Sequence, residues 1–142
     1  MYTGLLHSHS YLRYVVLVLL IIVVVASLVG WLGKKPYTGT NNRLSLSLLI
    51  ATHVQFLLGF ILYFVSPFVQ FNSSTMKDAT TRYWTVEHIS MMIIAVALIT
   101  AGRNTAKKMT VDEAKHKRLF IFNTIALLII LAAIATSGRR II

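Results

Sequence analysis

Four apolar stretches, each about 20 residues long and nearly free of charge, fill most of this sequence. A hydrophobic segment of that length forms a helix that can cross the roughly 30 Å hydrocarbon core of a bilayer. Charged residues make up 13% of the chain, whereas soluble domains average about 25%. We therefore predict an integral membrane protein with one transmembrane domain over residues 1–142. Its spans lie at about 11–32, 44–66, 83–102 and 119–138.

The connections between the predicted spans are short. In lipid, an open chain can satisfy its backbone polar groups only by forming helices. Short connections favour antiparallel neighbours, so we expect an all-α, up-down-up-down four-helix bundle. Thr110 and Glu113 have the spacing of a capping box, which predicts that the last helix begins before its membrane span.

Basic residues are distributed unevenly between the two sides of the predicted bundle. The connections after the first and third spans hold Lys34, Lys35, Arg43, Arg103, Lys107, Lys108, Lys115, Lys117 and Arg118. The opposite side holds Arg13, Lys77, Arg82, Arg139 and Arg140. Because basic loops remain in the cytoplasm, both termini are expected outside.

The remaining composition excludes several classes of function. The chain has no cysteine, so it forms no disulfide and no thiolate metal site. Its net charge of +10 comes from residues between the apolar stretches, where they contact anionic lipid headgroups. We therefore expect the lipid bilayer as a partner and no binding to nucleic acid.

Two histidines, His53 and His88, lie inside the predicted spans. An ionisable side chain in a membrane span is costly and indicates a functional site by default. Neutral imidazole binds haem iron without adding charge, so the two residues are candidate axial ligands of a haem b. His9, just before the first span, is the substitute for His53. His88 is common to both pairings and is the first candidate.

The predicted depths of these histidines do not match well. At 1.5 Å per residue, His88 lies about 6 Å outside the membrane midplane and His53 about 4 Å inside it. The mismatch of about 10 Å is large for two ligands of one iron in a straight bundle. His9 and His88 differ by roughly 12 Å on the same basis.

Two charged residues accompany the predicted site. Arg13 and Glu87 are both expected about one turn inside the outer boundary of their spans, and His9 shares a helix face with Arg13. We predict that Arg13 and Glu87 compensate charge there, either with each other or with a haem propionate. His116 stands among Lys115, Lys117 and Arg118, and is expected on a solvated or headgroup-facing surface.

Several segments carry a family resemblance. They are residues 1–15 (MYTGLLHSHSYLRYV), 51–59 (ATHVQFLLG), 82–88 (RYWTVEH) and 112–118 (DEAKHKR). In these segments the chain resembles small four-span bacterial membrane proteins labelled cytochrome b or cytochrome-b-like. The resemblance implies haem b, electron transfer, and a location in the bacterial inner membrane. It does not identify which histidines bind iron.

The leading hypothesis is a haem b electron carrier or a haem-bearing subunit of a respiratory complex, without substrate chemistry of its own. Its partners would be a redox protein or a larger membrane complex, with a quinone as a further candidate. The main alternative is a haem-free accessory subunit of such a complex. Two others are a copper-handling protein using His7, His9 and Met91 or Met92, and a small transporter using Glu87 as a proton site.

Overall fold

The computed structural model describes residues 2–65, 71–72, 76–78, 82 and 86–136. Nearly all of these residues are helical, and they contain no strand. The helices are α1 (Tyr2–Leu32), α2 (Gly39–Val65), α4 (His88–Lys108) and α5 (Asp112–Thr136). All four are long and apolar enough to span a membrane. The predicted all-α membrane fold is therefore confirmed.

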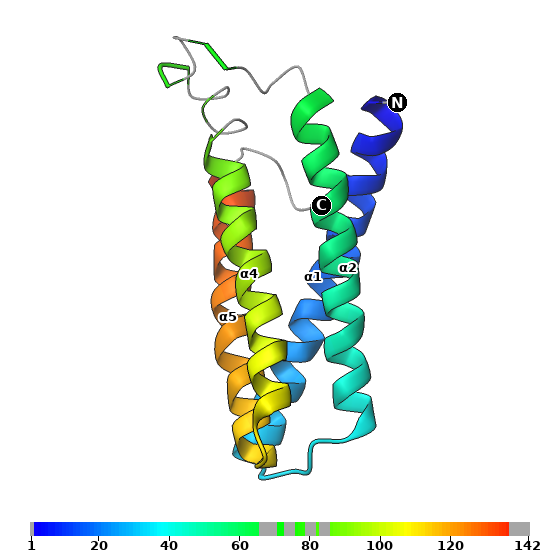
Figure 1. Cartoon of the computed structure of the whole chain (residues 1–142), viewed down its shortest axis with the longest axis vertical. Helices are drawn as coiled ribbons and strands as arrows, with labels where there is room; N and C mark the ends of the chain where they lie inside the picture. Colours follow the sequence, from blue (N-terminus) through cyan, green and yellow to red (C-terminus); the bar gives the residue numbers. More distant parts are fainter. Residues whose placement is uncertain (1, 66–70, 73–75, 79–81, 83–85, 137–142) are drawn as a thin grey trace.

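The four helices run antiparallel to their neighbours along the chain (Figure 1). α1 packs on α2 and α5, and α4 packs on α5, while α2 and α4 meet along a thinner contact. α1 and α4 are therefore diagonal across the bundle. We call the end with residues 33–38 and 109–111 the loop end, and the end where α1 begins the terminal end. This arrangement confirms the up-down-up-down bundle.

Most helices extend beyond the predicted spans. α1 begins at Tyr2 instead of residue 11, and α4 continues to Lys108 instead of residue 102. The prediction measured apolarity, whereas a helix continues into polar sequence until its backbone is interrupted. α5 begins at Asp112, which confirms that the last helix starts before its predicted membrane span. The predicted boundary residues 66, 83–85 and 137–138 lie outside the described residues.

The turn at the loop end has a clear local origin. Lys34 adopts a left-handed backbone with φ 51°, which ends α1, and Pro36 follows it. Thr38 then caps α2, because the backbone N–H of Asn41 donates to the Thr38 hydroxyl at 3.4 Å. The Asn41 side-chain oxygen accepts from the Thr38 N–H in return, at 3.0 Å.

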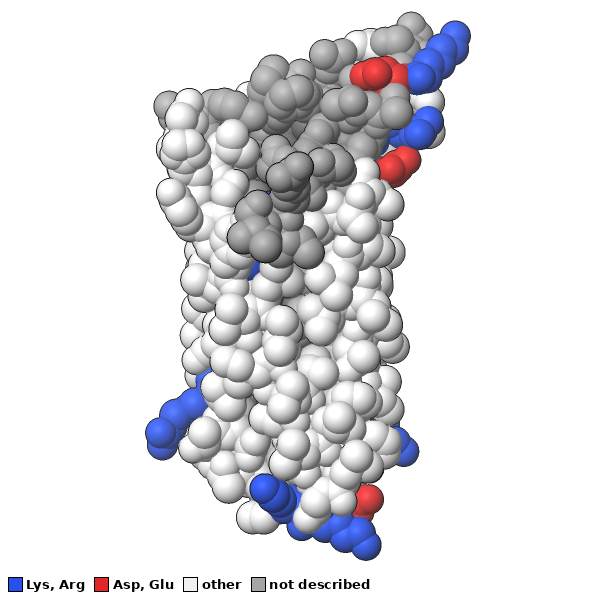
Figure 2. Space-filling view, turned by 180° about the vertical axis from the view of Figure 1, so that it is seen from behind, with Lys and Arg blue, Asp and Glu red and all other residues white. Residues whose placement is uncertain are grey.

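The bundle is held together by apolar side chains along its axis. Leu20, Leu48 and Ile99 are almost fully buried, and Ala95 and Ala126 allow α4 and α5 to approach closely. Outside, large apolar side chains remain exposed along every helix. Charged side chains gather at the two ends and leave an almost uncharged band between them (Figure 2). This surface matches that of a multi-pass membrane protein.

Candidate functional site

His9 lies where α1 packs on α2. The Gln55 side-chain amide of α2 donates to the His9 carbonyl oxygen at 2.8 Å, which fixes the two helices at this level. A Cβ atom added to Gly59 would lie 3.1 Å from His9 Cε1. The absence of a side chain at Gly59 therefore makes room for the imidazole ring.

His88 is the first residue of α4, on the helix diagonal to α1, and is partly buried. The upper end of α4 lies below the upper ends of α1 and α2 (Figure 1). His9 also lies below the end of its helix, because it follows Tyr2 by seven residues, or about 10 Å. His9 and His88 therefore both lie in the half of the bundle that includes the terminal end.

His53 lies apart from His88 in the structure. Its side chain is exposed, and its Nε2 atom lies 3.0 Å from the Thr100 hydroxyl of α4. Thr100 follows His88 by twelve residues, or about 18 Å along the helix axis. The His53 and His88 rings cannot flank one iron in this arrangement, and Nε2 of His53 is already engaged.

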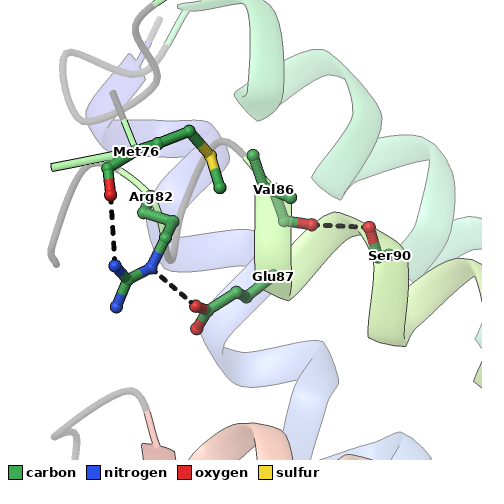
Figure 3. Close-up of polar contacts among 5 residues, drawn as sticks. All are labelled: Met76, Arg82, Val86, Glu87 and Ser90. Atoms are coloured by element: carbon green, nitrogen blue, oxygen red, sulfur yellow. Dashed lines mark hydrogen bonds and ion pairs between the residues drawn. The ribbon is translucent and has the colours of Figure 1, made fainter. Parts of the chain in front are cut away.

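Glu87 precedes α4 and binds Arg82 instead of Arg13. The Arg82 Nε atom lies 2.9 Å from a Glu87 carboxylate oxygen, and both side chains are partly exposed (Figure 3). Another guanidinium nitrogen of Arg82 donates to the Met76 carbonyl at 3.2 Å. The predicted direct pair of Arg13 and Glu87 is therefore wrong. The reason is that Arg82, only five residues from Glu87, reaches the carboxylate first.

Arg13 lies within α1, eleven residues after the helix begins at Tyr2. It donates to the Tyr14 hydroxyl at 3.0 Å, and its guanidinium lies 4.9 Å from the centre of the Tyr14 ring. Its Nε atom is buried and has no hydrogen-bond partner in the described part of the chain. A buried donor without an acceptor is costly in lipid, so this atom marks a position where an anionic ligand group would be stabilised.

The copper-binding alternative is not supported by the geometry. His7 and His9 lie on one helix, and residues two apart on a helix do not share a face. His7 is exposed, whereas His9 packs toward α2. Within the described residues, no three His, Cys, Asp or Glu side chains gather to hold a metal ion.

His116 is the clearest departure from the sequence analysis. It was expected on a solvated surface, yet it is only 1% exposed. Its Nε2 atom lies 3.1 Å from the Lys35 carbonyl oxygen, so the ring ties α5 to the loop after α1. A Cβ atom on Gly30 would overlap three atoms of the His116 ring. His116 therefore fits against bare backbone of α1.

A helical pattern could have revealed this burial. His116 begins a stripe spaced by three or four residues along α5, and every member is buried: Leu119, Asn123, Ala126, Ile130 and Ala133. The three adjoining basic residues masked that stripe, because they made the segment look like a solvated surface.

Arg103 is a second buried polar residue that sequence reasoning placed in a loop. It lies within α4, is 6% exposed, and donates to the Asn42 carbonyl oxygen at 3.2 Å. Nearby, burial raises the pKa of the Tyr37 hydroxyl above its usual value, and the Arg103 charge offsets part of that rise. The Tyr37 and His116 rings lie 5.5 Å apart. The loop end is therefore closed by a polar cluster of the buried Arg103 and His116 with the half-buried Tyr37.

The comparisons with known proteins add no further constraint. No family model, no curated protein and no solved structure matches the chain.

Proposed function

We propose that this chain is a haem b-binding electron-transfer protein of the membrane, with His9 and His88 as the axial pair. The observation that carries the proposal is their arrangement at one end of the bundle, on diagonal helices α1 and α4. Two ligands on diagonal helices approach a bound group from opposite sides. His53, the first partner considered for His88, takes no part in this pairing.

One further feature near His9 fits such a group. Arg13 follows His9 by one helical turn, and its buried Nε lacks an acceptor among the described residues. A haem propionate supplies such an acceptor. Arg13 therefore keeps its predicted role as the partner of a haem propionate. Glu87 takes no part in the proposed site, because its carboxylate is paired with Arg82.

His9 and His88 would hold the haem, which would supply one-electron transfer when bound. The protein groups hold it, set its polarity and exclude water. The proposed partners are the bilayer and either a redox protein or a larger membrane complex. The proposed location is a bacterial inner membrane with both termini outside, as the charge distribution favours.

The absorption spectrum of the purified, reduced protein tests this function. We expect the sharp bands of a six-coordinate haem, and we expect both His9→Ala and His88→Ala to lose them. His7→Ala is a matched control, since it removes an exposed histidine two residues from His9. His53→Ala is a second control. Both controls should keep the spectrum.

Two outcomes would overturn the proposal. A colourless wild-type protein would favour the haem-free accessory subunit. An unchanged spectrum in His9→Ala would reject His9 as a ligand even if haem is present.

A further inference from the structure

The hydrogen bonds around His53 determine which of its ring nitrogens carries the proton. The Thr100 hydroxyl lies 2.8 Å from the Val96 carbonyl, and a carbonyl can only accept, so the one hydroxyl proton of Thr100 is used there. The Thr100 oxygen must then accept from His53 Nε2, 3.0 Å away. Neutral imidazole carries one N–H, so Nδ1 of His53 is left as a bare acceptor.

That acceptor has no partner within the described residues. The His53 side chain is exposed, at the thin contact between α2 and α4 that we call the α2–α4 seam. His53 lies fourteen residues from the start of α2 and twelve from its end, or about 21 Å and 18 Å. Lipid headgroups and bulk water lie at the helix ends, so neither supplies a donor at this depth.

Aromatic rings follow His53 along the same face of α2. Phe56 and Phe60 lie three and seven residues after His53, and their ring centres are 6.2 Å apart at 28°. Phe60 is also exposed to the bilayer. An aromatic ligand could therefore lie against these rings while its hydroxyl reaches the imidazole.

We propose that the α2–α4 seam binds a lipid-soluble ligand with a phenolic hydroxyl, such as a hydroquinone, through a hydrogen bond from that hydroxyl to His53 Nδ1. The ligand must dissolve in the hydrocarbon core because the acceptor lies at mid-depth. It must also carry a donor, because Nδ1 can only accept. The site does not depend on haem, and it uses neither His9 nor His88.

The test uses the purified protein in lipid nanodiscs, with a decyl-substituted hydroquinone as the probe. The matched control ligand is its dimethyl ether, which has the same ring and tail but no O–H. We expect the hydroquinone to bind about fivefold more tightly than the ether, the effect of one hydrogen bond. His53→Ala should abolish this preference. Empty nanodiscs correct for partitioning into lipid.

Nitrogen NMR of histidine-labelled protein reads the tautomer directly. We expect a protonated Nε2 and a bare Nδ1 in His53, with a shift of the Nδ1 signal when the hydroquinone is added. Thr100→Val removes the acceptor that fixes the tautomer, so the preference for hydroquinone over ether should shrink. A protonated Nδ1 in the wild type, equal binding of the two probes, or an unchanged preference in His53→Ala would each overturn the proposal.

Failure of this site is distinguishable from failure of the haem proposal. The haem spectrum responds to His9→Ala and His88→Ala, whereas probe binding responds to His53→Ala and Thr100→Val. A protein with no haem that still prefers the hydroquinone would retain this inference.

Discussion

His116 at the loop end and His53 at the α2–α4 seam donate through the same ring nitrogen, yet their surroundings are opposite. Nε2 of each ring faces an acceptor oxygen, from Lys35 in one case and Thr100 in the other. The bare Nδ1 of His116 is buried with no described partner. The Nδ1 atom of His53, in contrast, belongs to an exposed side chain. The same chemistry thus holds the structure together in one region and leaves a binding position open in the other.

The largest expected effect is that of Gly30→Ala, which tests the tight packing at the loop end. The added methyl would overlap the His116 ring, so we expect a loss of about 1–3 kcal/mol in the free energy of unfolding. Equilibrium unfolding in mixed micelles measures it. The double variant Gly30→Ala with His116→Ala should lose less than the sum of the two single variants. If the losses of the two single variants simply add in the double variant, the methyl group of Gly30→Ala does not contact the His116 ring.

Alanine in place of either histidine compares the two regions directly. His116→Ala removes a buried ring and a hydrogen bond to the loop, so we expect a loss of about 2 kcal/mol in stability. His53→Ala removes an exposed ring with one hydrogen bond, for which about 1 kcal/mol or less is expected. If the two variants lost equal free energy of unfolding in the same assay, the contrast between the two regions would be wrong.

Alkaline pH provides a smaller effect confined to the loop end. Burial raises the folded-state pKa of Tyr37, so the folded protein holds this proton more tightly than the unfolded chain does. The resulting stability is full below the unfolded pKa, near 10. It is lost as the pH rises through the folded value. Tyr37→Phe should therefore lose less stability than the wild type above that pH, and parallel pH profiles would contradict this.

The smallest expected effect is at the terminal end, where Arg82 and Glu87 pair near the surface. Both side chains are about two-fifths exposed, at 38% and 42%. Exposed pairs contribute about 1 kcal/mol or less, so Glu87→Gln should change the free energy of unfolding only slightly. Added salt should reduce even that difference. If Glu87→Gln lost as much free energy of unfolding as His116→Ala, the ion pair at the terminal end would stabilise the fold as strongly as the packing of His116 at the loop end.

The fold could be predicted from the sequence because lipid leaves an open chain few choices. Four apolar stretches with short connections dictated four antiparallel helices. The partners of individual side chains could not be predicted in the same way. His53 binds Thr100 because α4 brings that hydroxyl to it, and no local pattern around His53 contains this information. The start of α1 at Tyr2 could not be predicted either, because hydropathy reports where a helix is apolar and not where it begins.

His116 illustrates the opposite case, in which the information was present but was outweighed. Its stripe along α5 has the spacing of a buried face, yet the flanking lysines and arginine suggested a surface. On a helix, neighbours in sequence point in different directions, so a buried residue can stand among exposed charges. Residues three and four away are the better guide to its environment.

The unequal lengths of the helices have a consequence for the membrane itself. α1 has 31 residues and α4 has 21, so their lengths are about 46 Å and 31 Å. Only the shorter matches a hydrocarbon core of about 30 Å. The first turns of α1 are more polar than the rest, so this excess length either extends into the headgroup region or enters the core when the helix tilts. His9 lies in the part of α1 that such adjustments affect most. The thickness of the host membrane therefore helps to determine whether the environment of this imidazole is hydrocarbon or headgroup.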